Sequence, residues 1–127
     1  MEETRVNWKE FLMVAKTPQS KKARGRKLQR YVVEKLIKEF GLHEDDCTSR
    51  SMGAGGEDVL LSPVARDKFP FSVECKNTEK LAIWSALEQA EENSGDYAPL
   101  VIFKRNRSEV YCAIKFDDLL KILQGLL

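Results

Sequence analysis

The pattern of apolar and polar positions is clearest in residues 26–40 (RKLQRYVVEKLIKEF), where apolar side chains recur every three or four residues. This spacing predicts an amphipathic α-helix, and Gly41 follows it at the position where glycine commonly ends a helix. Residues 5–15 show a weaker pattern of the same kind, which allows a short helix. The break at residues 17–20 (TPQS) separates the two predicted helices.

Four segments have the length and composition of short strands: residues 58–61, 71–76, 100–104 and 110–114. The second of them (FSVECK) alternates between apolar and polar side chains, which predicts a strand with two different faces. The polar, glycine-rich residues 42–57 predict a loop before the first strand.

Two further helices complete the prediction. One can begin at Asn77 or Thr78, either of which can cap it, and runs to about Asn93; the last spans residues 116–124. Within the first of them, Trp84 belongs to an apolar stripe that predicts core packing rather than base stacking. The order of elements predicts an α/β (α+β) fold with a mixed central sheet flanked by helices.

The chain length of 127 residues suits one domain. We expect residues 21–127 to form this single domain and residues 1–20 to be an N-terminal extension. No run of about 18 apolar residues occurs, so we expect no membrane-spanning segment. The charged N-terminus argues against a secretory signal.

The residue types available limit the chemistry of any active site. The three cysteines, Cys47, Cys75 and Cys112, lack the spacing of a zinc site or a disulfide framework. His43 is the one histidine, which disfavours histidine-centred metal sites and Ser-His-Asp catalysis. Carboxylates must therefore be the main ligands of any ion, which points to magnesium, manganese or calcium.

Charge is distributed unevenly along the chain. Nine lysines and arginines lie between Lys16 and Lys38, opposed by Glu34, so this segment carries +8 although the whole chain carries +1. A basic segment beside an acidic remainder fits a nucleic-acid-binding protein with a carboxylate metal site. A solvated helix with a basic arm would have the same pattern.

Glu74 and Lys76 lie on one face of the predicted strand at residues 71–76, and Cys75 lies on the other, apolar face. A carboxylate and an ammonium group placed in this way can bind a divalent cation and stabilise a hydroxide beside it. An ion pair on a solvated sheet face would show the same spacing.

Asp58 begins the preceding strand, directly after the glycine-rich residues 53–56. If this strand pairs antiparallel with residues 71–76, Asp58 lies beside Glu74, because neighbouring strands are about 4.8 Å apart. Two such carboxylates can share one cation, and without a cation their repulsion would keep one of them protonated. The glycines would let a phosphate approach the backbone, or they simply form a flexible loop.

Gln29 lies near the middle of the apolar face of the helix at residues 26–40, whereas Glu34 points away from it. A buried amide needs hydrogen-bond partners, and a metal-bound water, a substrate phosphate or a backbone carbonyl would each satisfy it. Arg30 lies at the edge of this face and either reaches a phosphate or is an ordinary surface arginine.

Together these residues resemble the PD-(D/E)XK nuclease superfamily, and within it archaeal-type Holliday junction resolvases and small phage-encoded nucleases. The resemblance covers about residues 24–115 and implies a restriction-endonuclease-like αβββαβ core. The matching pieces, in chain order, are residues 24–30 (the resolvase motif Lys-Gly-x-x-x-Glu-Arg), 49–53 (a serine-glycine loop), 57–59 and 73–76 (the two metal-binding strands) and 88–91 (a run in the following helix).

The resemblance implies a Mg²⁺-dependent DNA endonuclease for which Mn²⁺ is a substitute. Asp58, Glu74 and the main-chain carbonyl of Cys75 would bind the ion. Lys76 would position the attacking water, and Gln29 would complete the catalytic site. The residues expected to hold the DNA backbone without reading its sequence are Lys21, Lys22, Arg24, Arg26, Lys27, Arg30, Arg50 and Ser51.

The chain also departs from the resolvase pattern. Gln29 stands where resolvases carry glutamate, and the missing charge could weaken the site or shift it from two ions to one. Branched DNA is the expected substrate, and a homodimer is expected because a two-fold substrate needs paired cuts. A nuclease of linear duplex, of the restriction or recombination type, and a non-catalytic DNA-binding module are the alternatives. We expect a cytoplasmic location, or the host cytoplasm if a phage encodes the chain.

Overall fold

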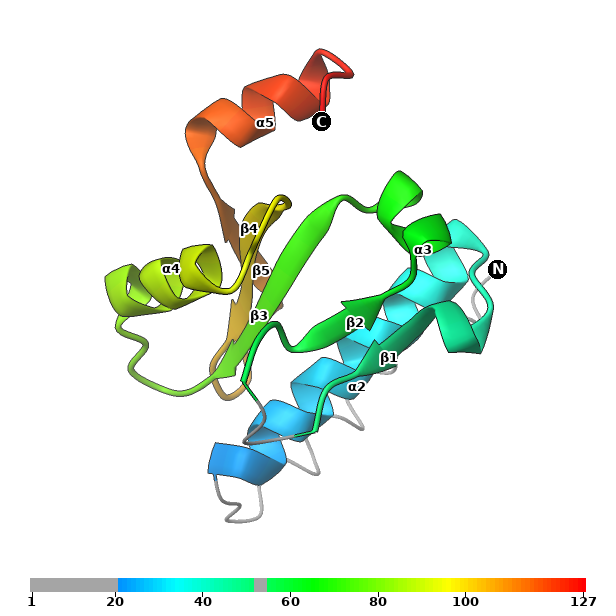
Figure 1. The fold of residues 1–127 in the computed structure, drawn as a ribbon. Coiled ribbons are helices and arrows are strands. Elements are labelled where there is room, and N and C mark those ends of the chain that lie inside the picture. Colours follow the sequence, from blue (N-terminus) through cyan, green and yellow to red (C-terminus); the bar gives the residue numbers. More distant parts are fainter. Residues whose placement is uncertain (1–20, 52–54) are drawn as a thin grey trace.

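The computed structural model describes residues 21–51 and 55–127. The predicted helix at residues 5–15, with the rest of the extension at residues 1–20, lies outside the described residues. No helix in the described part of the chain is both long enough and apolar enough to cross a bilayer. The elements drawn in Figure 1 are α2 (Lys21–Phe40), the 3₁₀ turn η2 (Glu44–Asp46), β1 (Cys47–Ser49), β2 (Val59–Leu61), α3 (Pro63–Lys68), β3 (Phe71–Asn77), α4 (Ile83–Glu92), β4 (Ala98–Lys104), β5 (Tyr111–Ile114) and α5 (Phe116–Leu123).

Strands β3, β4 and β5 form a mixed sheet with β4 in the middle. β3 pairs parallel with β4, which places Glu74 opposite Val101, and β4 pairs antiparallel with β5. The parallel pair requires a crossover connection, which α4 provides. The predicted α/β fold with a mixed central sheet between helices is therefore confirmed.

Helices α2 and α4 cover opposite faces of this sheet (Figure 1). On one face, Leu28 and Val32 of α2 pack in the same core cluster as Val73 of β3. On the other face, Ala90 of α4 packs against Val101 of β4. Ser72, Glu74 and Lys76 of β3 face α4, and every residue of the strand is buried or half-buried.

Strands β1 and β2 form a separate antiparallel pair, in which Ser49 lies opposite Val59. The sequence predicted a loop over residues 42–57, and β1 (CTS) is too short and polar for alternation to reveal it. The expected antiparallel pairing of the strand at Asp58 with β3 is wrong. Asp58 precedes β2, and β2 pairs with β1, since the chain turns into α3 directly after Ser62.

The helix bounds differ from the predictions at three places. α2 begins at Lys21, earlier than the periodicity indicated. α3 was missed because Ser62-Pro63 suggested only the end of a strand, whereas Ser62 Oγ accepts the N–H of Ala65 and caps a short helix. α4 begins at Ile83 instead of Asn77 or Thr78, because β3 continues to Asn77.

Trp84 is 78% exposed, so the prediction that it packs in the core is wrong. Ala86 and Ala90 are the buried residues of α4. At 100° per residue, Trp84 lies on nearly the opposite side of the helix from Ala86. The small alanines bring α4 close to the sheet and turn the indole ring outward.

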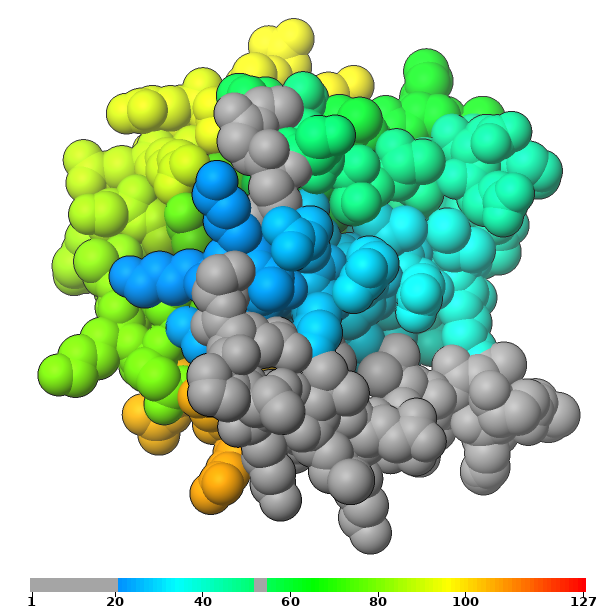
Figure 2. All heavy atoms as spheres, turned by 90° about the horizontal axis from the view of Figure 1, so that it is seen from below, coloured from blue at the N-terminus to red at the C-terminus, as the bar shows by residue number. Residues whose placement is uncertain are grey.

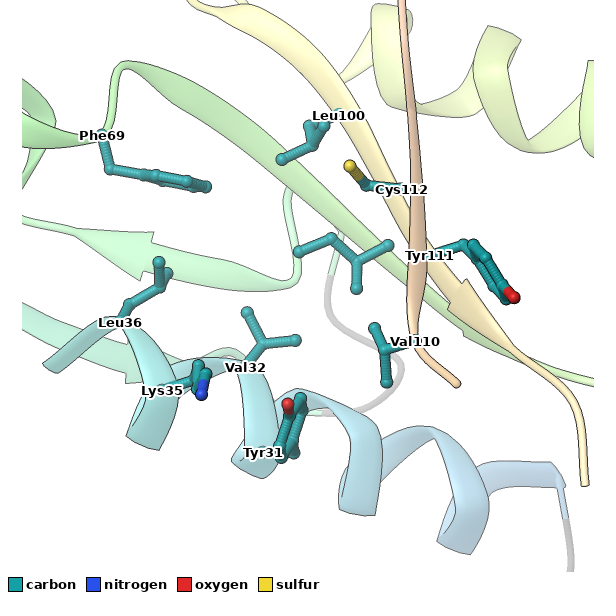
Figure 3. Close-up of a pocket in the computed structure, with 10 residues that line it drawn as sticks. Tyr31, Val32, Lys35, Leu36, Phe69, Leu100, Val110, Tyr111 and Cys112 are labelled. Atoms are coloured by element: carbon teal, nitrogen blue, oxygen red, sulfur yellow. The ribbon is translucent and has the colours of Figure 1, made fainter. Parts of the chain in front are cut away.

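An apolar pocket of about 290 Å³ lies between α2 and the sheet (Figure 3). Its lining side chains come from α2, the end of the α3 segment, β4 and β5: Tyr31, Val32, Lys35, Leu36, Phe69, Leu100, Ile102, Val110, Tyr111 and Cys112. This pocket is on the α2 side of the sheet, whereas Glu74 faces α4. The pocket and the side chain of Glu74 therefore lie on opposite faces of the sheet.

Candidate active site

Asp58 is fixed beside the edge of β3 by two hydrogen bonds. Its backbone N–H donates to the carbonyl of Val73 at 2.8 Å, and its Oδ2 accepts the N–H of Cys75 at 2.7 Å. The carboxylate thus occupies the place of a carbonyl from a neighbouring strand. Asp58 reaches β3 through its side chain and its own N–H, without the strand ladder that the sequence suggested.

Glu74 lies next to Asp58 and is 2% exposed. Burial is the main cause that raises the pKa of Glu74 from 4.5 to about 7, followed by the negative charge of Asp58 and a hydrogen bond between the two carboxyl groups. A hydrogen bond from Asn93 and the charge of Lys76 lower this pKa in part. Glu74 therefore keeps its proton to a much higher pH than an ordinary glutamic acid does.

Lys76 lies two residues beyond Glu74 on the face of β3 that meets α4. Its Nζ donates to Oε1 of Gln89 at 2.8 Å, which anchors the ammonium group to α4. Its positive charge acts on Glu74, whose pKa it lowers. Asp58, Glu74 and Lys76 are thus brought together at one place in the fold.

Asn93 also belongs to this cluster, and sequence reasoning missed it. It caps the C-terminus of α4, and its Nδ2 donates to Oε2 of Glu74 at 3.2 Å and to the carbonyl of Gly56 at 3.4 Å. Ser72 of β3 in turn donates to the Asn93 carbonyl at 3.3 Å. Gln89 and Asn93 are four residues apart and share one helix face, and this spacing was the available signal.

The residue before Asp58 is held by two arginines. Arg66 of α3 forms a half-buried ion pair with the Glu57 carboxylate and donates to the carbonyl of Phe71 at 2.8 Å. Arg50 donates through Nε to the carbonyl of Glu57 at 2.6 Å. Arg66 therefore ties the segment that carries Asp58 to the first residue of β3, which limits how far the two carboxylates can separate.

One protein-family model, described as "Phage putative PDDEXK endonuclease", matches residues 14–126. The chain belongs to this family of phage PD-(D/E)XK endonucleases. No curated protein and no solved structure matches the chain. The family match covers every described helix and strand and extends into residues 1–20.

The carboxylate pair of this endonuclease fits a divalent cation. Among the described residues, no group of three or more His, Cys, Asp or Glu side chains could hold a metal ion together. The carbonyl and N–H of a strand residue point to the same edge, so the Cys75 carbonyl faces the side where Asp58 lies. Burial raises the pKa of the Cys75 thiol well above its usual value, so the thiol stays protonated and is a poor ligand.

Gln29 is 4% exposed and lies on the buried face of α2, which packs against β1 and β3. The predicted inward orientation of Gln29 is therefore confirmed, and Glu34 is exposed as expected. The part that Gln29 plays in catalysis stays a prediction.

The residues predicted to hold DNA, which are basic except for Ser51, lie on the first three turns of α2 and directly after β1. Figure 2 shows these first turns, in blue, at the surface of the face formed by α2. The carbonyl of Arg24 accepts a hydrogen bond from Asn77 at 3.2 Å, which places this part of α2 beside the end of β3 that carries Lys76. The exposed members are Lys21, Lys22, Arg26, Arg30 and Ser51, and the half-buried members are Arg24, Lys27 and Arg50.

Proposed function

We propose that this endonuclease uses Mg²⁺, or Mn²⁺ in its place, to hydrolyse phosphodiester bonds in branched DNA, and that it acts as a homodimer. The observation that carries the proposal is the contact between the carboxyl groups of Asp58 and Glu74 at the edge of β3. A divalent cation would offset the repulsion between the buried carboxyl group of Glu74 and the half-buried carboxyl group of Asp58.

Asp58, Glu74 and the carbonyl of Cys75 would hold the metal, which when bound polarises the phosphate and makes water a stronger nucleophile. Lys76 stabilises the negative charge that develops on the phosphate in the transition state, because Gln89 fixes its ammonium group beside the carboxylates. Asn93 keeps Glu74 in place through its hydrogen bond. Gln29 completes the site from α2.

The basic side chains on α2 would bind DNA phosphates near the scissile bond. The hydrogen bond between Asn77 and the carbonyl of Arg24 supports this placement of the DNA, because it joins the basic start of α2 to β3, the strand that carries Glu74 and Lys76. Contacts to phosphates position a duplex without reading its bases, which suits selection by shape. The likeness of residues 24–30 to the resolvase motif favours branched DNA, whose two-fold symmetry calls for two active sites.

A cleavage assay on matched substrates tests the proposal. The purified chain is incubated with a labelled four-way junction, a linear duplex of the same sequence and a single strand, each with Mg²⁺, Mn²⁺ or EDTA. The Glu74→Gln variant is run in parallel, because it keeps the size of the side chain and removes its charge. We expect metal-dependent cutting of the junction by the wild type and none by the variant.

Other outcomes separate the alternatives. Equal cutting of junction and linear duplex would reject branch selectivity and assign a general nuclease. Binding of the junction without cutting under any metal would reject catalysis and favour the non-catalytic DNA-binding module, for which the neutral Gln29 is the supporting feature. Cutting that survives the Glu74→Gln change would place the active site elsewhere.

A further inference from the structure

A second pocket, of about 310 Å³, lies at the carboxyl ends of the parallel strands β3 and β4. We call it the strand-end pocket. Crevices at the carboxyl ends of parallel strands are frequent ligand sites in α/β folds. Its lining comes from the segment after β3, the end of β4, the turn between β4 and β5, and the start of β5: Thr78, Glu79, Leu81, Phe103, Lys104, Arg105, Ser108 and Tyr111.

The strand-end pocket lies close to the proposed catalytic lysine. Lys76 of β3 is opposite Phe103 of β4, and Phe103 is opposite Tyr111 of β5, so the three residues form one row across the sheet. Neighbouring strands are about 4.8 Å apart, which puts the backbone of Tyr111 about 10 Å from that of Lys76. One strand of DNA advances about 3.4 Å per nucleotide, so this distance corresponds to about three nucleotides.

Tyr111 offers an aromatic surface at this pocket. Its side chain is 57% exposed, and its ring lies beside that of Phe103, with 6.1 Å between the ring centroids. Figure 3 shows the ring of Tyr111 pointing away from Val32 and Leu36 of the apolar pocket on the α2 side. An exposed aromatic ring in a groove that follows a DNA backbone is a platform on which a base stacks.

Hydrogen bonds hold the two sides of the strand-end pocket together. The backbone N–H of Asn106, in the turn between β4 and β5, donates to Oε2 of Glu79 at 2.5 Å. Within the turn, Nζ of Lys104 donates to the carbonyl of Arg105 at 2.8 Å, and Oγ of Ser108 accepts the N–H of Arg105 at 3.0 Å. The turn is therefore tied to the segment that follows β3, and the pocket is formed before a ligand arrives.

Positive charge surrounds the mouth of the pocket. Arg105 and Arg107 are both exposed in the turn. Arg107 has a φ of 61°, a conformation that glycine adopts at less cost, so the turn carries a guanidinium group where its backbone favours glycine. The hydrogen bond from Asn77 to the Arg24 carbonyl brings the basic start of α2 to the same end of the sheet (Figure 1).

We propose that the strand-end pocket takes an unpaired base of the DNA substrate, which stacks on Tyr111 while Arg105 and Arg107 bind the neighbouring phosphates. The inference rests on the proposed function, because it takes DNA as the substrate, and it adds the feature that separates a branch from a linear duplex. In a linear duplex, pairing and stacking hold each base in place. At a branch a base leaves the stack at a smaller cost.

Binding assays in EDTA test the pocket without cleavage. Electrophoretic titrations compare a four-way junction with a linear duplex of the same sequence. For Tyr111→Ala we expect a dissociation constant raised about tenfold for the junction and less than about twofold for the duplex. Tyr111→Phe keeps the ring and should bind as the wild type does. Phe116→Ala is the matched control, because Phe116 is also an exposed aromatic residue and lies beyond the other end of β5.

Cross-linking tests whether a base reaches Tyr111. Junctions that carry 5-iodouracil at one of the first four positions from the branch are irradiated with the protein, and the cross-linked peptide is identified by mass spectrometry. We expect a cross-link to Tyr111 with the junction, none with the linear duplex, and none for Tyr111→Ala. Circular dichroism checks that each variant is folded.

Three results would overturn the inference: junction binding that Tyr111→Ala does not weaken, an equal loss on junction and duplex, or no cross-link to Tyr111. Cleavage with Mg²⁺ is measured separately. A chain that binds junctions through Tyr111 but cuts no DNA would overturn the proposed catalysis and leave this pocket assigned. Metal-dependent cutting of the junction that Tyr111→Ala leaves unchanged, together with unchanged binding, would overturn the pocket alone.

Discussion

The backbone N–H of Cys75 donates to Oδ2 of Asp58 at 2.7 Å, so a side chain takes the place of a neighbouring strand at the edge of β3. Together with the bond from the Asp58 N–H to the Val73 carbonyl, it holds Asp58 beside Glu74 although β2 pairs with β1 and not with β3. The same carboxyl group that accepts the Cys75 N–H also forms a hydrogen bond with the carboxyl group of Glu74.

Removing the charge of either carboxylate or of the lysine is expected to abolish cleavage. Asp58→Asn keeps an oxygen that can accept the Cys75 N–H, and Glu74→Gln keeps the shape of its side chain, so both should fold. Lys76→Ala removes the ammonium group that we propose stabilises the transition state, and a loss of about 10²–10³-fold is typical for such a group. Single-turnover experiments measure the cleavage rate of each variant, and electrophoretic assays measure its DNA binding.

The matched control for these three variants is Glu88→Gln, an exposed carboxylate on α4. It should cleave at the wild-type rate. DNA binding should stay measurable in all four variants, because the basic residues of α2 are unchanged. Wild-type cleavage by any of the three site variants would refute the site assignment.

The raised pKa of Glu74 predicts how stability depends on pH in the absence of metal. Between 4.5, its ordinary pKa, and about 7, its pKa in the folded chain, the folded state holds a proton that the unfolded state has lost. The contribution of this group to stability therefore falls as pH rises through that window, by on the order of 3 kcal/mol. Above about pH 7 the loss is complete.

Glu74→Gln removes this titration. In EDTA the variant should match the wild type near pH 5 and exceed its stability near pH 8, as measured by urea unfolding at both values. Added Mg²⁺ should stabilise the wild type at the higher pH and leave the variant unchanged. Identical pH profiles for the two proteins would show that the carboxyl pair is not coupled as described.

Asn93→Ala is expected to weaken the site without touching the residues proposed to hold metal. The substitution removes the hydrogen bonds to Glu74 and to the Gly56 carbonyl, which should cost about 1–3 kcal/mol of stability. It should also raise the pKa of Glu74, so more metal is needed for half-maximal cleavage. Gln124→Ala at the end of α5 is the control amide, because it lies far from this cluster in the chain and is exposed. An unchanged metal requirement would assign Asn93 a purely structural role.

Much of the site could be predicted because alternation on one strand is a local property. FSVECK alone places Glu74 and Lys76 on one face and Cys75 on the other, and helical periodicity alone turns Gln29 inward. Asn93 was missed because its spacing from Gln89 shows only that two amides share a helix face, whereas its hydrogen bond to Glu74 depends on how α4 packs against β3. The same holds for Arg66, whose partners Glu57 and Phe71 come from two other segments.

The errors in the fold also have a physical cause. Residues 47–49 and 63–68 are short elements whose existence depends on contacts made elsewhere in the chain, and a run of three residues has no detectable period. Trp84 was misplaced for a different reason. Trp84 belongs to an apolar stripe of α4, but Ala86 and Ala90 pack against the sheet, and the indole ring of Trp84 therefore remains exposed.

Gln29→Glu tests whether the buried amide belongs to the active site. If Gln29 faces the metal and its water, a glutamate gains a compensating cation, and the variant should fold in Mg²⁺ and cleave at least as fast as the wild type. Gln29→Leu should keep the core packed and lose most of the activity. If Gln29 is only a core residue, the buried charge should destabilise Gln29→Glu by several kcal/mol, with or without metal, and bring no gain in cleavage. Urea unfolding with Mg²⁺ and with EDTA, measured beside the cleavage rate, separates the two results, because only a site residue makes the stability of the glutamate variant depend on metal.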